Sequence, residues 1–324
     1  MTSIFRFACS ALALVMGPQV LAASPSYPHP LKAFEVESQQ QTLTMRYMDV
    51  TPAPDAPPRG TALLLHGKNF CADYWVDSIE LLRASGYRVV VPEQIGFCSS
   101  DLPRRYQYSF HQLASNTRAL LDHLAVDETL VIGHSMGGML ATRYALKYPQ
   151  QVTRLVLVNP IGLEDWVKLG VPHTPIDVAY AAERKKSFAS IKRYQIENYY
   201  DGDWSPAYER WARRLAALYE GPRGDDIAWS QALTYDMLQT QPVVHEFEAL
   251  QVPTVLIIGL RDRTAPGRGR APAEVARQLG NYPVLGRQTA ASIPDAQLIE
   301  FEGLGHLPQI EDFERYAAAL KPLL

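Results

Sequence analysis

The sequence predicts an α/β protein with a mostly parallel, doubly wound sheet and a helical cap inserted after its first half. Apolar, β-branched runs alternate with segments whose apolar residues recur at helical spacing, which indicates parallel strands with crossover helices. One such strand, 129–134, enters a helix through a Gly-His-Ser-Met-Gly segment at 133–137. Between 162 and 249 there is no buried-strand run, and tyrosines and tryptophans are frequent among charged residues.

The elements can be assigned in chain order. Residues 33–48 should form a first strand or hairpin, and a proline-rich turn at 51–58 precedes the core. Apolar runs predict buried strands at 61–65, 88–92, 129–134, 154–159 and 252–258. Helical spacing of apolar residues predicts helices at 78–85, 109–124 and 138–147. The predicted domains are a signal peptide at 1–22, a first half of the core at 23–161, the cap at 162–249 and a second half of the core at 250–324.

The first 22 residues are typical of an export signal. Arg6 precedes an apolar run at 8–16, and a Val-Leu-Ala segment ends at Ala22, where cleavage is expected. This predicts a secreted or periplasmic protein. The apolar run is too short for a stable membrane span, and Gly17-Pro18 would break a helix there. A retained interfacial anchor is the alternative.

Composition excludes several classes of partner. The net charge of −3 over 324 residues gives no bias toward polyanions, so nucleic acid is not expected as a partner. The eight histidines form no metal-binding motif with one another or with the cysteines. No glycine-rich phosphate loop is present. We therefore expect no metal and no cofactor, and a small molecule as the binding partner.

Ser135 is the predicted nucleophile. On a tight strand-to-helix turn, Gly133 and Gly137 remove the side chains that would block close packing, so the serine hydroxyl is held above the end of the sheet. The first amides of the following helix favour negative charge, such as develops on an attacked carbonyl oxygen. An ordinary turn serine is the alternative.

Further candidate residues occur in a fixed order around this serine. An apolar strand upstream ends in His66-Gly67, the strand at 252–258 leads to Asp262, and His306 lies in a Gly-Leu-Gly-His-Leu-Pro segment near the C-terminus. With Ser135, these four motifs resemble the α/β-hydrolase superfamily, in its lid-bearing branch of serine esterases and C–C bond hydrolases. The resemblance covers the chain from residue 61 onward and implies the α/β-hydrolase fold.

The resemblance also implies a role for each residue. His306 would act as general base and then as general acid, and Asp262 would hold the tautomer of the imidazole and stabilise its charged form. The alternatives are a solvated loop histidine and a surface ion pair of Asp262 with Arg261 or Arg263. Backbone amides of Met136 and Lys68 would form the oxyanion hole.

Residues around Lys68 leave two questions open. Asn69 is the fallback oxyanion donor, and His66 is expected to order the loop rather than act as a second base. The Lys68 side chain either points to solvent, the preferred interpretation, or reaches the pocket and favours an anionic substrate.

Cys71 and Cys98 remain once the signal is removed. In the superfamily, the strands that precede them are neighbours in the sheet, so the resemblance implies a Cys71–Cys98 disulfide between two loops at the rim of the active site. The alternative is two unpaired cysteines that pack as small hydrophobic residues.

Asp262 and His306 are separated by 43 residues, more than the usual helix and strand require. We assign the excess to an inserted loop or helix start around 281–288, near the active-site face. It would either shape the substrate entrance or cover the edge of the sheet.

The predicted function is that of an exported serine hydrolase. It would cleave a carboxylic ester, or a lactone or thioester, of a small to medium substrate through an acyl-enzyme. C–C hydrolysis, amide hydrolysis and perhydrolysis on the same residues are alternatives, as is a non-catalytic binding protein on the same fold. Ser135 excludes the members of the superfamily that use an aspartate nucleophile.

Overall fold

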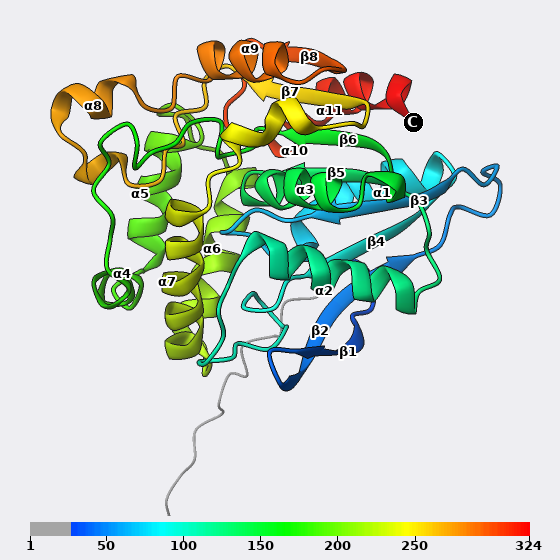
Figure 1. Ribbon diagram of the computed structural model, residues 1–324, viewed down its shortest axis with the longest axis horizontal. Helices are drawn as coiled ribbons and strands as arrows, with labels where there is room; N and C mark the ends of the chain where they lie inside the picture. Colours follow the sequence, from blue (N-terminus) through cyan, green and yellow to red (C-terminus); the bar gives the residue numbers. More distant parts are fainter. Residues whose placement is uncertain (1–26) are drawn as a thin grey trace, which may run out of the picture.

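The computed structural model describes residues 27–324, so the predicted signal peptide at 1–22 lies outside the described residues. Within that range, eight strands form one sheet in the order β1-β2-β4-β3-β5-β6-β7-β8 (Figure 1). The strands are β1 Lys32–Ser38, β2 Gln41–Val50, β3 Gly60–Leu65, β4 Tyr87–Glu93, β5 Thr129–His134, β6 Val152–Val158, β7 Thr254–Gly259 and β8 Ala296–Phe301. Strand β2 is antiparallel to both of its neighbours, and every other pair is parallel.

Helices cover both faces of this sheet. On one face α2 (Phe110–His123), α3 (Met136–Lys147) and α9 (Tyr282–Ser292) pack into one hydrophobic core, and on the other α1 (Val76–Ala84) and α11 (Phe313–Leu320) pack into a second. Every residue of β5 and β7 is buried, because these central strands are covered on both sides. The predicted fold class is therefore confirmed.

Four helices lie between β6 and β7 in the sequence, and we call them the cap. They are α4 (Ile176–Glu183), α5 (Phe188–Asn198), α6 (Pro206–Glu220) and α7 (Gly224–Thr240). A 3₁₀-helix, η3 (Val244–Ala249), returns the chain to the core. Figure 1 shows the cap helices beside one end of the sheet, at the left of the view. None of the described helices is both long and apolar enough to cross a membrane.

The extra length between Asp262 and His306 does not lie where the sequence placed it. Residues 282–292 form α9, which contacts β7 and β8 and is the ordinary crossover helix between them. The helix start expected at 281–288 is present, with Pro283 in the first turn, but it opens this crossover helix and not an insertion. Gly286 packs against Ile258, where an added Cβ would lie 3.1 Å from Cγ1. The additional chain is instead 263–280, which holds η4 (Arg268–Arg270) and the short helix α8 (Ala273–Gln278).

Candidate active site

Ser135 lies between the end of β5 and the start of α3 with a strained backbone. Its φ of 57° and ψ of −121° are unusual for a residue with a side chain. The turn is held by close packing, because a Cβ on Gly133 would lie 2.3 Å from the Gly137 oxygen and one on Gly137 would lie 2.1 Å from the Leu65 oxygen. The two glycines are thus needed for the approach of α3 to β3 and β5.

His306 and Asp262 form a buried pair. The imidazole Nδ1 donates to Asp262 Oδ2 over 2.6 Å, and both side chains have zero exposure. Asp262 also accepts from the Asn159 side chain at 2.9 Å and from the Thr264 amide at 2.8 Å. The carboxylate thus accepts three hydrogen bonds with its four oxygen lone pairs, so its hydrogen-bonding capacity is largely used. Its neighbour Arg261 pairs instead with two exposed aspartates, so Asp262 is not part of a surface ion pair.

The proton on Nδ1 leaves Nε2 of His306 as an acceptor. Among residues 27–324, this buried nitrogen has no hydrogen-bond partner. A direct bond from Ser135 Oγ is thus not formed in this geometry, and such catalytic bonds often tighten only with substrate bound.

The segment around His306 is held on several sides. Its amide donates to the Tyr199 carbonyl at 2.8 Å, and the two rings stack with centroids 4.4 Å apart. Glu311 accepts the amides of Gly305 and Leu307 at 2.8 and 2.9 Å. Burial raises the pKa of Glu311 to about 7. The histidine is therefore positioned by its neighbours and by the cap.

The loop after β3 lies directly against the serine turn. A Cβ on Gly67 would lie 3.1 Å from that of Ser135, so the residue before Lys68 packs against the serine turn. Met136 is the first residue of α3, so its amide has no partner within the helix. His66 donates from Nδ1 to the Gly67 carbonyl and accepts the Gln94 amide at Nε2. Burial lowers the pKa of His66 to about 4, and its bonds order the loop.

A hydrogen-bonded chain joins this loop to His306. The Gly67 amide donates to the Tyr74 hydroxyl at 3.2 Å, which donates to Nδ1 of His134 at 3.1 Å. Nε2 of His134 then donates to the His306 carbonyl at 2.9 Å. Burial and the neighbouring His306 hold the pKa of His134 well below its usual value, so the ring stays neutral and keeps this tautomer.

The Lys68 side chain does not point to solvent, contrary to the preferred interpretation of the sequence. It lines the cavity, and Nζ donates to Gln231 Oε1 at 2.5 Å and lies 3.8 Å from Glu183 Oε1. Burial lowers the pKa of Lys68 to about 7. The cap residues around Nζ come from α4 and α7, far away in the sequence. Asn69 donates to the Tyr199 hydroxyl at 2.7 Å.

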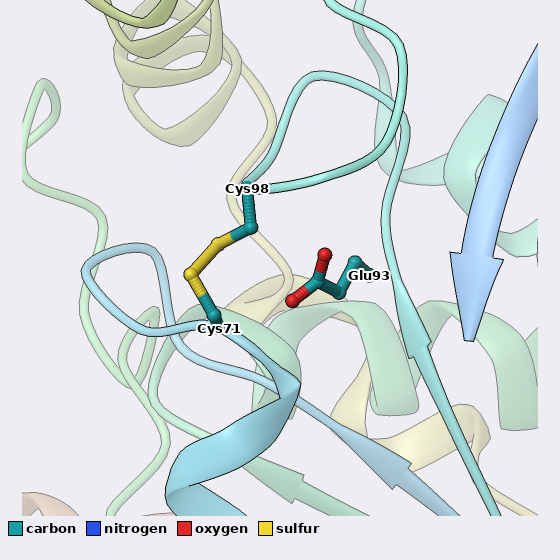
Figure 2. Close-up of side chains that lie close together, drawn as sticks. All are labelled: Cys71, Glu93 and Cys98. Carbon is teal, nitrogen blue, oxygen red and sulfur yellow. A yellow bond between two sulfur atoms is a disulfide. The ribbon is translucent and has the colours of Figure 1, made fainter. Parts of the chain in front are cut away.

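The Cys71–Cys98 disulfide is present, as the sequence predicted, with Cα atoms 5.7 Å apart. Figure 2 shows the carboxylate of Glu93 beside it. Glu93 accepts the amides of Ala72 and Ser99, which follow the two cysteines. Both sulfur atoms are used in the disulfide, so this cluster supplies no thiolate for a metal.

A cavity of about 650 Å³ opens above Ser135. The core contributes Ile161, the cap contributes Gln195 and Tyr194, and the segment 264–270 forms a further wall. Thus the extra chain before α8 borders the cavity, although 281–288 does not.

Three residues of this region were missed by sequence reasoning. Asn159 directly follows β6 and also accepts the Gly259 amide at 2.8 Å, and a polar residue at the carboxyl end of a buried strand was a usable signal. Gln195 lies in α5 and Tyr199 directly follows it, and nothing in the sequence shows which side of this helix faces the cavity and His306.

Comparison with known proteins identifies the family of this chain. The family model for the alpha/beta hydrolase fold matches residues 62–313. A probable hydrolytic enzyme from Pseudomonas aeruginosa PAO1 is 52% identical in sequence, with a TM-score of 0.90 over 92% of this chain and 95% of that one. The 2-hydroxymuconate semialdehyde hydrolase of Pseudomonas putida is 26% identical over 81% of this chain and 86% of its own length. An esterase from Exiguobacterium antarcticum shares the fold, with 17% identity and a TM-score of 0.65 over 87% of this chain and 96% of its own. The chain belongs to the α/β-hydrolase family.

Proposed function

We propose that this protein is a serine hydrolase that cleaves a carboxylic ester, or a lactone or thioester, through an acyl-enzyme. The observation that carries the proposal is the position of Ser135, on a strained turn that lines the cavity. It directly follows His134, which bonds the carbonyl of His306 in the buried His306–Asp262 pair. No metal or cofactor takes part in the proposed steps.

The first half of the reaction forms the acyl-enzyme. Ser135 Oγ attacks the carbonyl carbon while Nε2 of His306 takes the hydroxyl proton. The negative oxygen of the tetrahedral intermediate accepts hydrogen bonds from the amides of Met136 and Lys68. The C–O bond then breaks, and the alcohol leaves with the proton from His306.

In the second half, water gives a proton to His306 and its oxygen attacks the acyl carbon. The bond from that carbon to Ser135 Oγ then breaks, and His306 returns the proton to Oγ. Asp262 keeps the proton of the imidazole on Nδ1 throughout and stabilises the charged ring. The dimensions of the cavity support a small or medium substrate, because about 650 Å³ falls within the ordinary range for small-molecule sites.

C–C bond hydrolysis is a second candidate, favoured by the curated relatives. Besides the enzyme from Pseudomonas putida, these include the 2-hydroxy-6-oxo-6-phenylhexa-2,4-dienoate hydrolase of Burkholderia cepacia, 26% identical over 81% of this chain and 86% of its own length. The same serine, histidine and oxyanion donors would then act on a ketone carbonyl.

We also propose that the protein is exported, with cleavage after Ala22. The Cys71–Cys98 disulfide supports an oxidising compartment, where such bonds persist. N-terminal sequencing of the protein from an oxidising extracytoplasmic fraction should begin at Ala23. Recovery of the intact chain from the cytoplasm alone would contradict export.

The experiment that tests the activity compares the mature protein with Ser135→Ala on p-nitrophenyl esters of increasing acyl length and on a 2-hydroxy-6-oxodienoate. Ser292→Ala, on an exposed position at the end of α9, is the matched control. Ester turnover that is lost in Ser135→Ala and kept in Ser292→Ala supports the esterase. Turnover of the dienoate alone supports C–C cleavage, and ester turnover that survives in Ser135→Ala overturns the mechanism.

A further inference from the structure

The cavity is positively charged, although the whole protein has a net charge of −3. Five cationic side chains line it: Lys68, Lys185, Lys186, Arg268 and Arg270. Glu183 and Glu197 are the carboxylates in the same lining. Clustered positive charge on a net negative protein favours an anionic ligand at that place.

Glu183 does not neutralise Lys68 fully, because it has a closer partner. Lys186 Nζ lies 2.8 Å from Glu183, and the Tyr219 hydroxyl donates to the same carboxylate at 2.5 Å. Lys68 lies farther away, at 3.8 Å, and its short hydrogen bond goes to the neutral amide of Gln231. An ammonium group has three donors, so Lys68 in its protonated form retains donor capacity and charge for a ligand.

Gln195 is an unpartnered polar side chain in the wall of this cavity. It is 1% exposed, and in the part of the chain that the structure describes neither amide atom has a hydrogen-bond partner. Buried amides are normally bonded, because an unpaired donor or acceptor costs free energy. Its N–H groups can donate to an anion. A site with one ammonium and one amide fits the single charge of a carboxylate better than a phosphate dianion, which needs more donors.

We propose that Lys68 and Gln195 form a subsite for a carboxylate group of the substrate, so that the enzyme prefers anionic acids esterified at their other end. This inference rests on the proposed ester hydrolysis. The lysine thus has two separate functions, since its backbone amide faces the reacting oxygen and its side chain binds the far end of the acyl group.

The test compares two substrates of equal length. The mono-p-nitrophenyl ester of adipic acid carries a free carboxylate, and p-nitrophenyl methyl adipate has the same chain with that group capped. At about pH 6, where Lys68 is mostly protonated, kcat/KM should favour the carboxylate by roughly tenfold or more, the range of one charge-assisted hydrogen bond. A ratio of kcat/KM for the carboxylate substrate to kcat/KM for the methyl ester that is near or below one in the wild type overturns the proposal.

The variants are judged by this ratio, because any disturbance of the oxyanion amide affects both substrates alike. Lys68→Met should abolish the preference and Lys68→Arg should retain part of it. Gln195→Leu should reduce it, and this change does not depend on a native hydrogen bond for folding. Lys168→Met removes the same charge from an exposed position outside the lining of the cavity and should leave the ratio within about twofold, as for ordinary surface changes. An unchanged ratio in both Lys68→Met and Gln195→Leu contradicts the subsite.

Binding without turnover separates the two proposals. Calorimetry with Ser135→Ala should detect monomethyl adipate, and the double variant Ser135→Ala/Lys68→Met should bind it at least about tenfold more weakly. If carboxylate binding is lost with Lys68→Met while no ester is hydrolysed, the subsite stands and the esterase fails. If esters are hydrolysed and binding does not depend on Lys68, the subsite fails.

Discussion

Tyr199 contacts His306 in two ways, through a 2.8 Å hydrogen bond from the His306 amide to its carbonyl and through stacking of the two rings. The hydroxyl of the same tyrosine accepts from Asn69, in the loop that follows β3. One residue at the end of α5 therefore touches the proposed base and the proposed oxyanion loop.

Replacing Tyr199 tests this relationship. Tyr199→Leu keeps the backbone hydrogen bond but removes the stacked ring, so kcat should fall about tenfold or more while KM changes little, because small misplacements of a catalytic group are costly. Tyr199→Phe keeps the ring and loses only the bond from Asn69, and its kcat should stay closer to the wild type. Steady-state kinetics on one ester give both values. Equal losses in the two variants would mean that the ring is not what positions His306.

Asn159 is expected to support Asp262. Asn159→Ala removes one donor to the buried Asp262 carboxylate and the acceptor of the buried Gly259 amide. The free energy of unfolding should therefore fall by about 1–3 kcal/mol. The value of kcat should fall as well, because the imidazole loses part of its support. Denaturant unfolding and ester kinetics measure the two effects. Asn281→Ala, at an exposed position, is the control, and a loss of the same size there would contradict the assignment.

Glu311 should make stability depend on pH. Burial raises its pKa from 4.5 to about 7, so between these values the native state binds more protons than the unfolded state. The free energy of unfolding therefore carries this contribution in full below pH 4.5 and loses it as the pH rises through about 7.

The change amounts to roughly 3 kcal/mol at most, and Glu311→Gln should lack it. Urea unfolding from about pH 4 to 8 covers this window, with Glu302→Gln on an exposed turn as control. Parallel pH profiles for the wild type and Glu311→Gln would show that this carboxyl titrates normally.

Removal of the disulfide should destabilise the protein. The bond closes a loop with a sequence separation of 27, for which chain entropy gives about 3–4 kcal/mol. Cys71→Ala/Cys98→Ala should therefore unfold at lower denaturant concentration, and its kcat should fall, because Lys68 and Asn69 belong to the loop that the bond holds. Wild-type protein under a thiol reductant should behave like the double variant. Unchanged unfolding in both samples would show that Glu93 and its two amide contacts hold the loops without the bond.

Gln195→Leu should stabilise the protein while it weakens carboxylate binding. An apolar side chain of similar size removes an unpaired buried amide, which should raise the free energy of unfolding by about 1 kcal/mol. Thermal unfolding measures the gain. Gln195→Glu is the comparison, because it adds a buried charge and should lower stability. A destabilised Gln195→Leu would indicate that the amide has a partner in solution.

The fold was predictable because its signals are local. Strand runs, helical spacing and the glycines around Ser135 each extend over a few residues. The Cys71–Cys98 pairing was implied by the resemblance to the superfamily, in which the two preceding strands are neighbours. The helix start expected at 281–288 is the start of α9, whereas the extra chain at 263–280 was not recognised.

The arrangement of the side chains that line the cavity was less predictable. The direction of the Lys68 side chain depends on Glu183 and Gln231, more than a hundred residues away. The lack of a hydrogen-bond partner for the Gln195 amide depends on how the cap packs, and no local sequence pattern predicts it. The catalytic roles of Ser135, Asp262 and His306 stay predictions until the variants are measured.

The contact between α5 and His306 limits how this cap can be exchanged for that of another family member. A chimera joined after β6 and before β7 would discard Tyr199 with the cap helices. Such a hybrid would retain Ser135, Asp262 and Glu311 but lose the carbonyl that holds the His306 amide. A graft that alters substrate range should therefore keep residues 195–200 from the parent and vary α4, α6 and α7 around them.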